Sequence, residues 1–409
     1  MSLLDKLSDG SVWESFYKYK CGLVCPKNFT SELRRFIDEK RYIPVCSEIY
    51  GGERFPLPKK SIISKMSSTK KRVVYTYPSD ENTVLKLLTY LMLRKYDGLF
   101  CDDLYSFRPG KTAKDAVRRL MRVKGLSEMY SYKVDISDYF NSVSVDALIP
   151  MLESALADDK RLFEFISSLL LEPNVIEKGE VHTQRKGIMA GTPISSFLAN
   201  LFLSELDRYF YDNGVVYARY SDDIILFAPT NEECVTHAEK IRAFLADHAL
   251  TVNPKKECFA SPDEGFTFLG FYVRGKVIDI APATVQKLKN KMRRKRDSLA
   301  RWKKRSETDG ERAAKAFIRV FNRKLLENAA DNELTWSSWF FPIITTTASL
   351  HEIDLYAQDC VRYLVSGKHT KARFNVRYDD IKKLGYRSLV HEYYNVNDEK
   401  QLPVSSEIL

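Results

Sequence analysis

The sequence predicts an α+β fold, in which helices pack on one face of a β-sheet. Residues 127–136 are rich in Tyr, Val and Ile, as strands are, and residues 191–212 repeat apolar side chains at helical spacing. Residues 215–228 contain two β-rich runs around a short polar turn, which is typical of a hairpin. A strand, a helix and a hairpin in this order indicate a sheet covered by helices.

The composition is that of a folded chain. Of 409 residues, 44% are hydrophobic and 29% are charged, which excludes wholesale disorder and a fibrous repeat. The longest uncharged stretches, 187–204 and 334–350, contain Gly, Pro, Ser, Thr or Asn, so no membrane span is expected. The N-terminus is acidic where a secretory signal would be basic, which favours a cytoplasmic protein.

The elements before the hairpin follow from local pattern. Residues 1–60 mix short helical patterns with four prolines and predict an irregular N-terminal layer. Residues 81–96 predict a helix that is apolar on most faces and therefore buried. The helix over 191–212 is expected to use Thr192 as its cap, with Pro193 in its first turn.

The elements after the hairpin are mainly helical. Residues 232–250 predict a helix, and residues 266–273 predict one short strand. From 283 to 364 the pattern is helical, and a C-terminal piece covers 371–395. This part also carries the charge: the chain has a net charge of +10, and residues 285–305 hold eleven basic residues and one acidic residue. Such a run predicts either a solvated helix face or a phosphate-binding surface.

Two carboxylates, Asp222 and Asp223, lie at the tip of the predicted hairpin. Like charges side by side raise each other's pKa unless a cation lies between them. Asp135, at the end of the strand over 127–136, would supply a third carboxylate. Oxygen ligands suit Mg²⁺, and three aspartates on two neighbouring strands could hold two metal ions for nucleotidyl transfer.

Asp379 and Asp380 provide an internal comparison, because residues 377–381 repeat much of the sequence of residues 219–224. A polar helical pattern follows this second pair, whereas a β-rich run follows the first. We therefore expect the second pair to cap a helix.

At this point the motifs resemble those of reverse transcriptases, in the bacterial branch that includes group II intron, retron and defence-associated enzymes. Each motif is weak alone, but six in the right order and spacing are not expected by chance. The similar blocks are YSFRPGKTAKDAV (105–117), KVDISDYF (133–140), GIMAGTPISSFLANLFL (187–203), YSDD (220–223), LTVNPKKECF (250–259) and FLGFYV (268–273).

The resemblance implies a right-hand polymerase with fingers, a ferredoxin-like palm and a helical thumb. Fingers with an N-terminal layer are expected over 1–130, the palm over 131–280, a basic thumb over 281–350 and a helical C-terminal extension over 351–409. The implied activity is RNA-directed DNA synthesis from dNTPs.

The resemblance also implies site residues. The catalytic set is Asp135, Asp222, Asp223 and Lys256, of which Lys256 would protonate pyrophosphate, with Lys255 as its neighbour and competitor for that role. Two Mg²⁺ ions, or Mn²⁺ in their place, are expected at Asp135, Ile136, Asp222 and Asp223.

Further residues would hold the nucleotide and the nucleic acid. Lys65 and Arg72 match the clamp on the incoming triphosphate, and Phe140 matches the ring that excludes a 2′-hydroxyl. Ala190 and Gly191 stand at the nucleotide site, where the family usually has Gln-Gly, so Ala190 departs from the pattern. The nucleic-acid-binding set is Asn200, Arg293, Arg294, Lys295 and Arg296.

The compact chain resembles defence-associated enzymes of this branch, some of which use a dedicated RNA. We therefore expect a structured noncoding RNA as template, a DNA product and an antiphage role, with no membrane partner and the oligomeric state open. Residues near both ends are candidates for stacking on unpaired RNA bases: Trp13, Phe16, Tyr17, Tyr19, Tyr386, Arg387, Tyr393 and Tyr394. Two alternatives stay open: a template-independent or protein-primed DNA polymerase of the abortive-infection type, and a non-catalytic RNA-binding protein on a polymerase fold.

Overall fold

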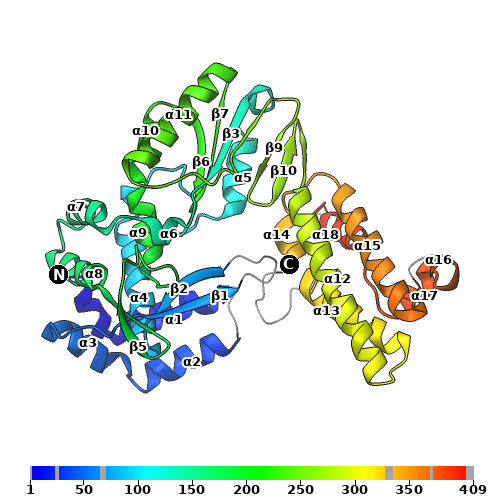
Figure 1. The fold of residues 1–409 in the computed structure, drawn as a ribbon, viewed down its shortest axis with the longest axis horizontal. Coiled ribbons are helices and arrows are strands. Elements are labelled where there is room, and N and C mark those ends of the chain that lie inside the picture. The colour runs from blue at the N-terminus through cyan, green and yellow to red at the C-terminus, as the bar shows by residue number, and fades with distance from the viewer. Residues whose placement is uncertain (1, 24–26, 65–70, 328–334, 369–371, 402–409) are drawn as a thin grey trace, which may run out of the picture. The chain divides into compact units, whose positions relative to one another are not determined.

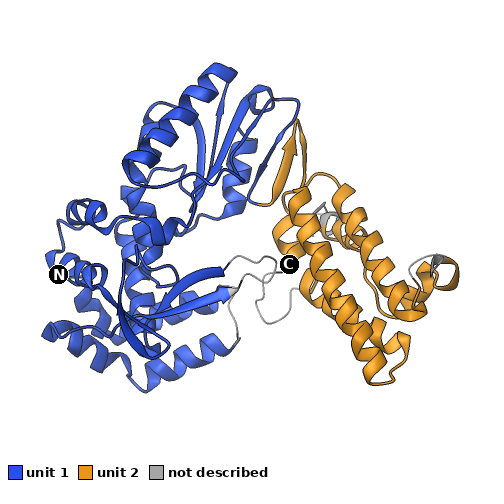
Figure 2. Cartoon of the chain, in the orientation of Figure 1, with its two compact units in different colours: residues 1–269 blue, residues 270–409 orange. Residues whose placement is uncertain are grey.

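The computed structural model describes residues 2–23, 27–64, 71–327, 335–368 and 372–401. The chain divides into two compact units, residues 1–269 and residues 270–409 (Figure 2). The expected division of the chain into four parts differs from this grouping. The boundary falls before residue 280, and the expected thumb and C-terminal extension belong to one unit.

The N-terminal layer is helical rather than irregular. A 3₁₀ turn, Leu4–Ser8, precedes helices α1 (Gly10–Cys21), α2 (Lys27–Asp38) and α3 (Tyr42–Gly51). The prediction of an irregular layer was wrong because proline is tolerated in the first turn of a helix. Pro44 lies in the first turn of α3, where a backbone N–H would have no hydrogen-bond acceptor within the helix. Trp13 is fully buried and stacks on Tyr42, with 5.1 Å between ring centroids, so the layer has a core of its own.

A first sheet interrupts the expected palm range. Its strand order is β2-β1-β4-β5, with β1 and β2 antiparallel and β1 and β4 parallel (Figure 1). The bounds are β1 Lys59–Ser64, β2 Lys71–Thr76, β4 Asn174–Glu177 and β5 Glu180–Thr183. Nearby helices are α4 (Ser79–Lys95), α7 (Val145–Ala155) and α8 (Lys160–Leu171). Helix α4 is buried on most faces, as the sequence predicted.

A second sheet, with strand order β6-β7-β3-β8, carries the three aspartates. All of its neighbouring strands are antiparallel. The strands are β3 Tyr130–Asp135, β6 Val216–Tyr220, β7 Asp223–Ala228 and β8 Cys258–Ala260, and the helices against them are α5 Ala113–Met121, α10 Ser204–Asp212 and α11 Asn231–Asp247. The α+β prediction is confirmed.

The predicted helix over 191–212 is two helices. Helix α9 is Ser195–Phe202, and the chain breaks at Leu203 before α10. The Thr192 hydroxyl donates to the Met189 carbonyl at 3.0 Å and does not cap α9. The short helix α6, Tyr139–Ser142, follows β3.

The second unit consists of a hairpin followed by helices. The predicted strand over 266–273 breaks at Leu269 and Gly270, which have φ of 50° and 89°, so that β9 (Phe266–Phe268) belongs to the first unit and β10 (Phe271–Arg274) to the second. The remaining elements are β11 Val277–Ile280, α12 Pro282–Arg305, α13 Gly310–Leu325, α14 Trp336–Phe340, α15 Ala348–Ser366, α16 Ala372–Asn375, α17 Tyr378–Lys383 and α18 Leu389–Gln401.

Helix α15 is the centre of this unit, since α12, α13, α17 and α18 all contact it. A side chain at Gly310 would place its Cβ 2.6 Å from the Val365 carbonyl oxygen, so glycine lets α13 start against the end of α15. Among the described residues, each helix is too short or too polar to cross a bilayer.

Candidate active site

The three aspartates lie together at one end of the second sheet. Strands β6 and β7 are joined by a two-residue turn, Ser221–Asp222, because Tyr220 pairs with Asp223. Asp223 in turn lies directly opposite Asp135 across the β3–β7 ladder. The Ile136 N–H donates to the Asp222 carbonyl at 3.3 Å, which ties the turn to the end of β3. Directly opposite residues point to the same face of a sheet, so Asp135 and Asp223 share a face.

The charges at this end of the sheet are unevenly neutralised. Burial raises the pKa of Asp222, and the negative charges of Asp135 and Asp223 raise it further. Lys256 forms an ion pair with Asp135 Oδ2, and Lys133 Nζ lies 3.8 Å from Asp223 Oδ1. Within the residues that the structure describes, no three His, Cys, Asp or Glu side chains converge as a ready-made metal cluster.

The contacts separate the two candidate lysines. Both lysines are exposed, but the Lys256 ammonium reaches Asp135, whereas for Lys255 it is the backbone N–H that makes a contact here, donating to Asn253 Oδ1 at 3.3 Å. Asn253 also donates from Nδ2 to Asp135 Oδ1 at 3.1 Å, and its N–H donates to the Asp135 carbonyl at 2.8 Å. Sequence reasoning missed Asn253, although it lies in the same block as Lys256.

The expected nucleotide-site residues within the described ranges belong to segments that contact one another. Phe140 is half-buried in α6, and its carbonyl accepts from the Ile188 N–H at 2.9 Å. The Ala190 carbonyl accepts from the Tyr75 N–H of β2 at 2.8 Å. Gly191 has φ of 101°, and a Cβ there would lie 3.0 Å from the Tyr75 carbonyl oxygen, so glycine allows this close approach. The loop 187–191 therefore links α6 to β2.

The two expected triphosphate-clamp residues are placed differently. Arg72 lies exposed on β2, opposite Ile63 of β1. Lys65 lies outside the described residues.

Asn200 does not lie on a template-facing surface. Its side chain is fully buried in α9. Nδ2 donates to the Ser106 carbonyl at 2.9 Å, and Oδ1 accepts from Ser106 Oγ at 3.1 Å. This placement differs from the expected contact with nucleic acid, because both amide atoms bind the loop that precedes α5.

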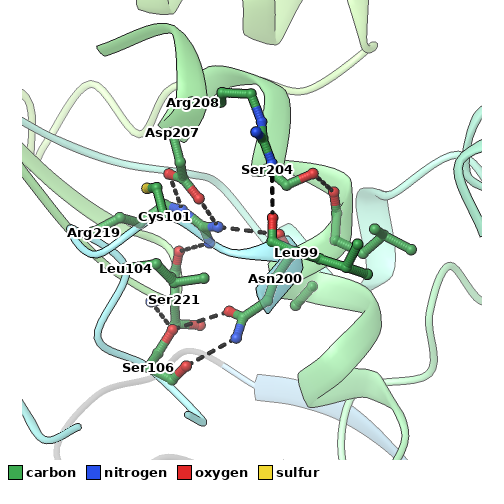
Figure 3. A network of polar contacts seen from close by, with 12 residues as sticks. Leu99, Cys101, Leu104, Ser106, Asn200, Ser204, Asp207, Arg208, Arg219 and Ser221 are labelled. Carbon is green, nitrogen blue, oxygen red and sulfur yellow. Dashed lines mark hydrogen bonds and ion pairs between the residues drawn. The ribbon is translucent and has the colours of Figure 1, made fainter. Parts of the chain in front are cut away.

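A buried polar network lies under the catalytic turn (Figure 3). Arg219, on β6, is fully buried and binds the Asp207 carboxylate through Nε and Nη2, at 2.7 and 2.5 Å. Tyr217 donates its hydroxyl to Asp207 Oδ1 at 2.8 Å. Sequence reasoning missed this network, because a buried ion pair and a solvated one look alike in a sequence.

The basic residues of α12 divide into two faces. The inner seam, at alternating spacings of four and three, faces α15 and consists of Val285, Lys289, Met292, Arg296, Leu299 and Lys303. Lys289 lies over the ring of Tyr356 at 5.5 Å, Arg296 lies over Tyr363 at 5.0 Å, and Lys303 donates to the Leu364 carbonyl. The outer stripe lies two residues further along and is exposed: Lys287, Lys291, Arg294, Arg301 and Arg305.

The four α12 residues expected to contact nucleic acid therefore lie on different faces of the helix. Arg293 and Arg294 are exposed, and Lys295 is half-buried. Arg296 belongs to the inner seam, where it lies over Tyr363 of α15, and it also pairs with its neighbour Asp297 on α12 at 2.7 Å. The prediction treated these four neighbours as one patch, but a helix turns about 100° per residue and points them in different directions.

An aromatic groove of about 380 Å³ lies beside the catalytic turn in the first unit. Its aromatic lining is Tyr19, Tyr90, Phe107 and Tyr220, and its basic lining includes Lys20, Lys86, Arg94 and Lys111. Phe107 is 40% exposed, and burial lowers the pKa of Lys86. Of the terminal aromatic residues expected to stack on RNA, Tyr19 lines this groove and Tyr394 is exposed, whereas four are buried: Trp13, Phe16, Tyr386 and Tyr393.

Comparison with known proteins identifies a family whose sequence pattern this chain matches. The family described as "Reverse transcriptase (RNA-dependent DNA polymerase)" matches residues 57–273, just over half of the chain. The chain is 22% identical to "Retron Ec86 reverse transcriptase" of Escherichia coli over 163 residues, which are 39% of this chain and 47% of that protein.

Two further relatives match at the same level. "Protein YkfC" of E. coli K12 is 22% identical over 262 residues, 54% of this chain and 68% of that protein. "Group II intron-encoded protein LtrA" of Lactococcus lactis subsp. cremoris is 22% identical over 191 residues, 46% of this chain and 31% of that protein. The match thus spans less than half the length of the retron and LtrA proteins. A solved telomerase from Candida tropicalis overlaps 80% of this chain and 59% of its own, at 12% identity and a TM-score of 0.48.

Proposed function

The chain belongs to the reverse transcriptase family, and from this premise we propose that it is an RNA-directed DNA polymerase that adds dNTPs to a primer 3′-hydroxyl. One observation carries the proposal. Asp135 and Asp223 lie opposite each other on adjacent strands, with Asp222 on the turn between β6 and β7. A carboxylate cluster on neighbouring strand ends is the arrangement that two-metal nucleotidyl transfer requires.

The chemistry of this site fits divalent cations. Its donors are carboxylate oxygens, which Mg²⁺ prefers, and the raised pKa of Asp222 reflects, besides burial, negative charge that a cation would neutralise. Two Mg²⁺ ions, for which Mn²⁺ could substitute, would supply Lewis-acid activation of the primer hydroxyl and the leaving pyrophosphate. Asp135, Asp222 and Asp223 would hold them, with the backbone carbonyl of Ile136. Lys256 forms an ion pair with the Asp135 carboxylate in this structure. During the reaction it would turn toward pyrophosphate and act as a proton donor.

The neighbouring segments support a nucleotide site. Phe140 would exclude the 2′-hydroxyl, since α6 and the loop 187–191 bond to each other and fix its backbone. Arg72 would bind the triphosphate from β2, with Lys65 beyond the described part of that hairpin. Gly191 would keep the loop 187–191 against β2 beside the nucleotide, whereas Ala190 lacks the amide that most of the family has there.

The aromatic groove would hold the single-stranded template next to the turn. Aromatic rings accept stacked bases of any sequence, and cations bind the phosphates between them. Four rings and five cations line this groove, including Tyr220, which adjoins the catalytic turn. The outer stripe of α12 would bind phosphates of the duplex through its arginines and lysines.

The template would be a structured noncoding RNA, and the role of the enzyme antiphage defence in the cytoplasm. This part of the proposal is supported by similarity to bacterial reverse transcriptases, one of them from a retron.

The experiment is primer extension with Asp222→Ala and Asp223→Ala combined. We expect Mg²⁺-dependent dNTP incorporation to disappear, while the variant unfolds at no lower temperature than the parent because mutual repulsion is removed. The matched control is Asp379→Ala with Asp380→Ala, since Asp380 only accepts the Arg377 N–H at the start of α17, at 2.9 Å. Polymerisation at the parental rate by the first variant would overturn the proposal.

A further inference from the structure

Ser221, the first residue of the catalytic turn, has a backbone conformation that serine disfavours. Its φ is 61°, in the left-handed region, and its side chain is buried. The left-handed conformation brings the Cβ of such a residue too close to the following carbonyl oxygen and is therefore unfavourable. A turn of two residues between antiparallel strands needs a positive φ at this position, so the rest of the fold must hold it there.

Two side chains hold both polar backbone groups of Ser221, one from a distant segment and one from the adjoining strand β6. Its N–H donates to Ser106 Oγ at 2.9 Å, and its carbonyl accepts from Arg219 Nη1 at 3.2 Å. Ser106 comes from the loop before α5, more than a hundred residues away in the sequence. The turn is therefore clamped from both sides of the same residue (Figure 3).

Asn200 fixes Ser106 in turn. Its amide makes two reciprocal hydrogen bonds with Ser106, at 2.9 and 3.1 Å. Its backbone carbonyl also accepts from Arg219 Nη2 at 3.2 Å. Ser106, Asn200 and Arg219 are all fully buried, so water cannot replace a broken hydrogen bond.

We propose that Ser106 and Asn200 are positioning residues, which hold Ser221 in its left-handed conformation so that Asp222 and Asp223 face Asp135. The proposal rests on the proposed function, because it assigns these residues to the same site. Asp222 follows Ser221 directly, and a change in the Ser221 backbone would move the carboxylate away from its partners. A displacement of about 1 Å at a reacting group can cost about a hundredfold in rate.

The first experiment measures Ser106→Ala and Asn200→Ala in steady-state extension. We expect kcat to fall roughly 10- to 100-fold, while KM for dNTP and Kd for template–primer stay within about twofold. Direct binding of the template by Asn200 would instead raise Kd and leave kcat in place. Ser349→Ala is the matched control, because Ser349 is a buried serine of the second unit whose hydroxyl bonds the Ile280 carbonyl at 3.3 Å.

The second experiment adds Ser221→Gly to Ser106→Ala. Glycine adopts a positive φ readily because it has no Cβ, so the turn depends less on the hydrogen bond from residue 221 to Ser106. We expect the double variant to recover part of the missing kcat, which a general loss of packing at Ser106 would not produce.

The third experiment is hydrogen–deuterium exchange of the peptide that contains Ser221. The Ser221 N–H should exchange faster in Ser106→Ala than in the parent, whether or not the protein polymerises. This readout separates the two proposals. A parent without polymerase activity would refute the proposed function, and the exchange rate of the Ser221 amide would still test whether Ser106 holds the turn. If Ser106→Ala does not fold, Ser106→Cys, with its weak acceptor, is measured by the same criteria.

Three results would overturn the clamp. They are an unchanged kcat in both single variants, an effect confined to Kd, and equal exchange of the Ser221 amide in parent and variant.

Discussion

We propose that Phe140 sets the choice of sugar. It is half-buried, and it packs edge to face on Tyr139 with 5.6 Å between centroids, so the ring is held on one side and open on the other. Its backbone is fixed by the Ile188 N–H. A ring held in this way has the rigidity that steric exclusion of a hydroxyl requires.

We predict that Phe140→Ala raises rNTP incorporation relative to dNTP by at least tenfold, since removing the ring makes room for the 2′-hydroxyl. Single-nucleotide extension with each substrate measures the ratio. Phe259→Ala, on β8 and stacked on Tyr132, should leave the ratio unchanged. If both variants keep the parental ratio, Phe140 only contributes to packing.

Asp103 and Asp102 are neighbours with opposite titration behaviour. Burial raises the pKa of Asp103 to about 6, with Asp102 and Asp207 adding to the rise and Arg119 and Lys111 opposing it. The hydrogen bond and charge of Lys111 lower the pKa of Asp102. A raised carboxyl pKa in the folded state means that stability is lost as pH rises from the unfolded value through the folded one.

We therefore predict that Asp103→Asn becomes more stable than the parent as pH rises from 4 to 7. The gain at pH 7 should be about 1–2 kcal/mol after screening by solvent. Asp102→Asn should do the reverse, because it removes a carboxylate that the fold favours in its charged form. Denaturant unfolding at both pH values measures the differences, and a gain for Asp103→Asn that does not depend on pH would contradict the assignment.

At the scale of the element, α12 has two chemical faces. The inner seam places lysine and arginine over tyrosine rings of α15, where their stems pack and their charges meet π faces. The outer stripe, two residues on, points to the opposite side of the helix, where an external anion can reach it. One run of charge thus serves folding on the inner seam, and we propose that it serves binding on the outer stripe.

We predict that changing Lys287, Arg294 and Arg301 to Gln weakens binding to any template–primer. The log–log salt slope should fall by about 0.7–0.9 for each phosphate that the variant no longer binds. The control removes equal charge from the inner seam, with Lys289, Arg296 and Lys303 changed to Gln. It should lower the unfolding temperature and leave the salt slope unchanged. The reverse pattern would assign binding to the inner seam.

At the scale of the whole molecule, selection of one RNA cannot come from phosphate binding, because every RNA offers phosphates. Most of the terminal aromatic residues do not supply it either, since Trp13, Phe16 and Tyr386 are buried in packing, whereas Tyr19 lines the aromatic groove. Recognition of shape by basic surfaces, together with stacking in the aromatic groove, is the remaining route on the described surface.

We predict that RNA recovered with the protein from native cells is dominated by one structured species. The variant Asp222→Ala with Asp223→Ala should recover the same RNA without cDNA, while the parent yields cDNA that maps to it. Recovered RNA that mirrors the bulk RNA of the cell would leave a polymerase without a dedicated partner.

What the sequence determined by itself was local. The β-rich runs around Ser221–Asp222 predicted the hairpin and its carboxylate tip, and the polar pattern after Asp380 predicted a cap instead. Both depend on residues within a few positions of each other, where alternation and capping are readable. The breaks at Leu203 and Leu269 were missed, because the apolar pattern continues across them while the backbone does not.

Only the tertiary structure decided which residues serve the site and which serve the fold. Ser106 and Asn200 meet the catalytic turn from segments far away in sequence, and Asn200 faces inward rather than toward a template. Arg296 and Arg294 are two positions apart, yet one packs on α15 and the other is exposed. The physical reason is that the burial and the partners of a side chain depend on which distant segments the fold brings next to it. The same polar side chain binds protein, solvent or nucleic acid according to those neighbours.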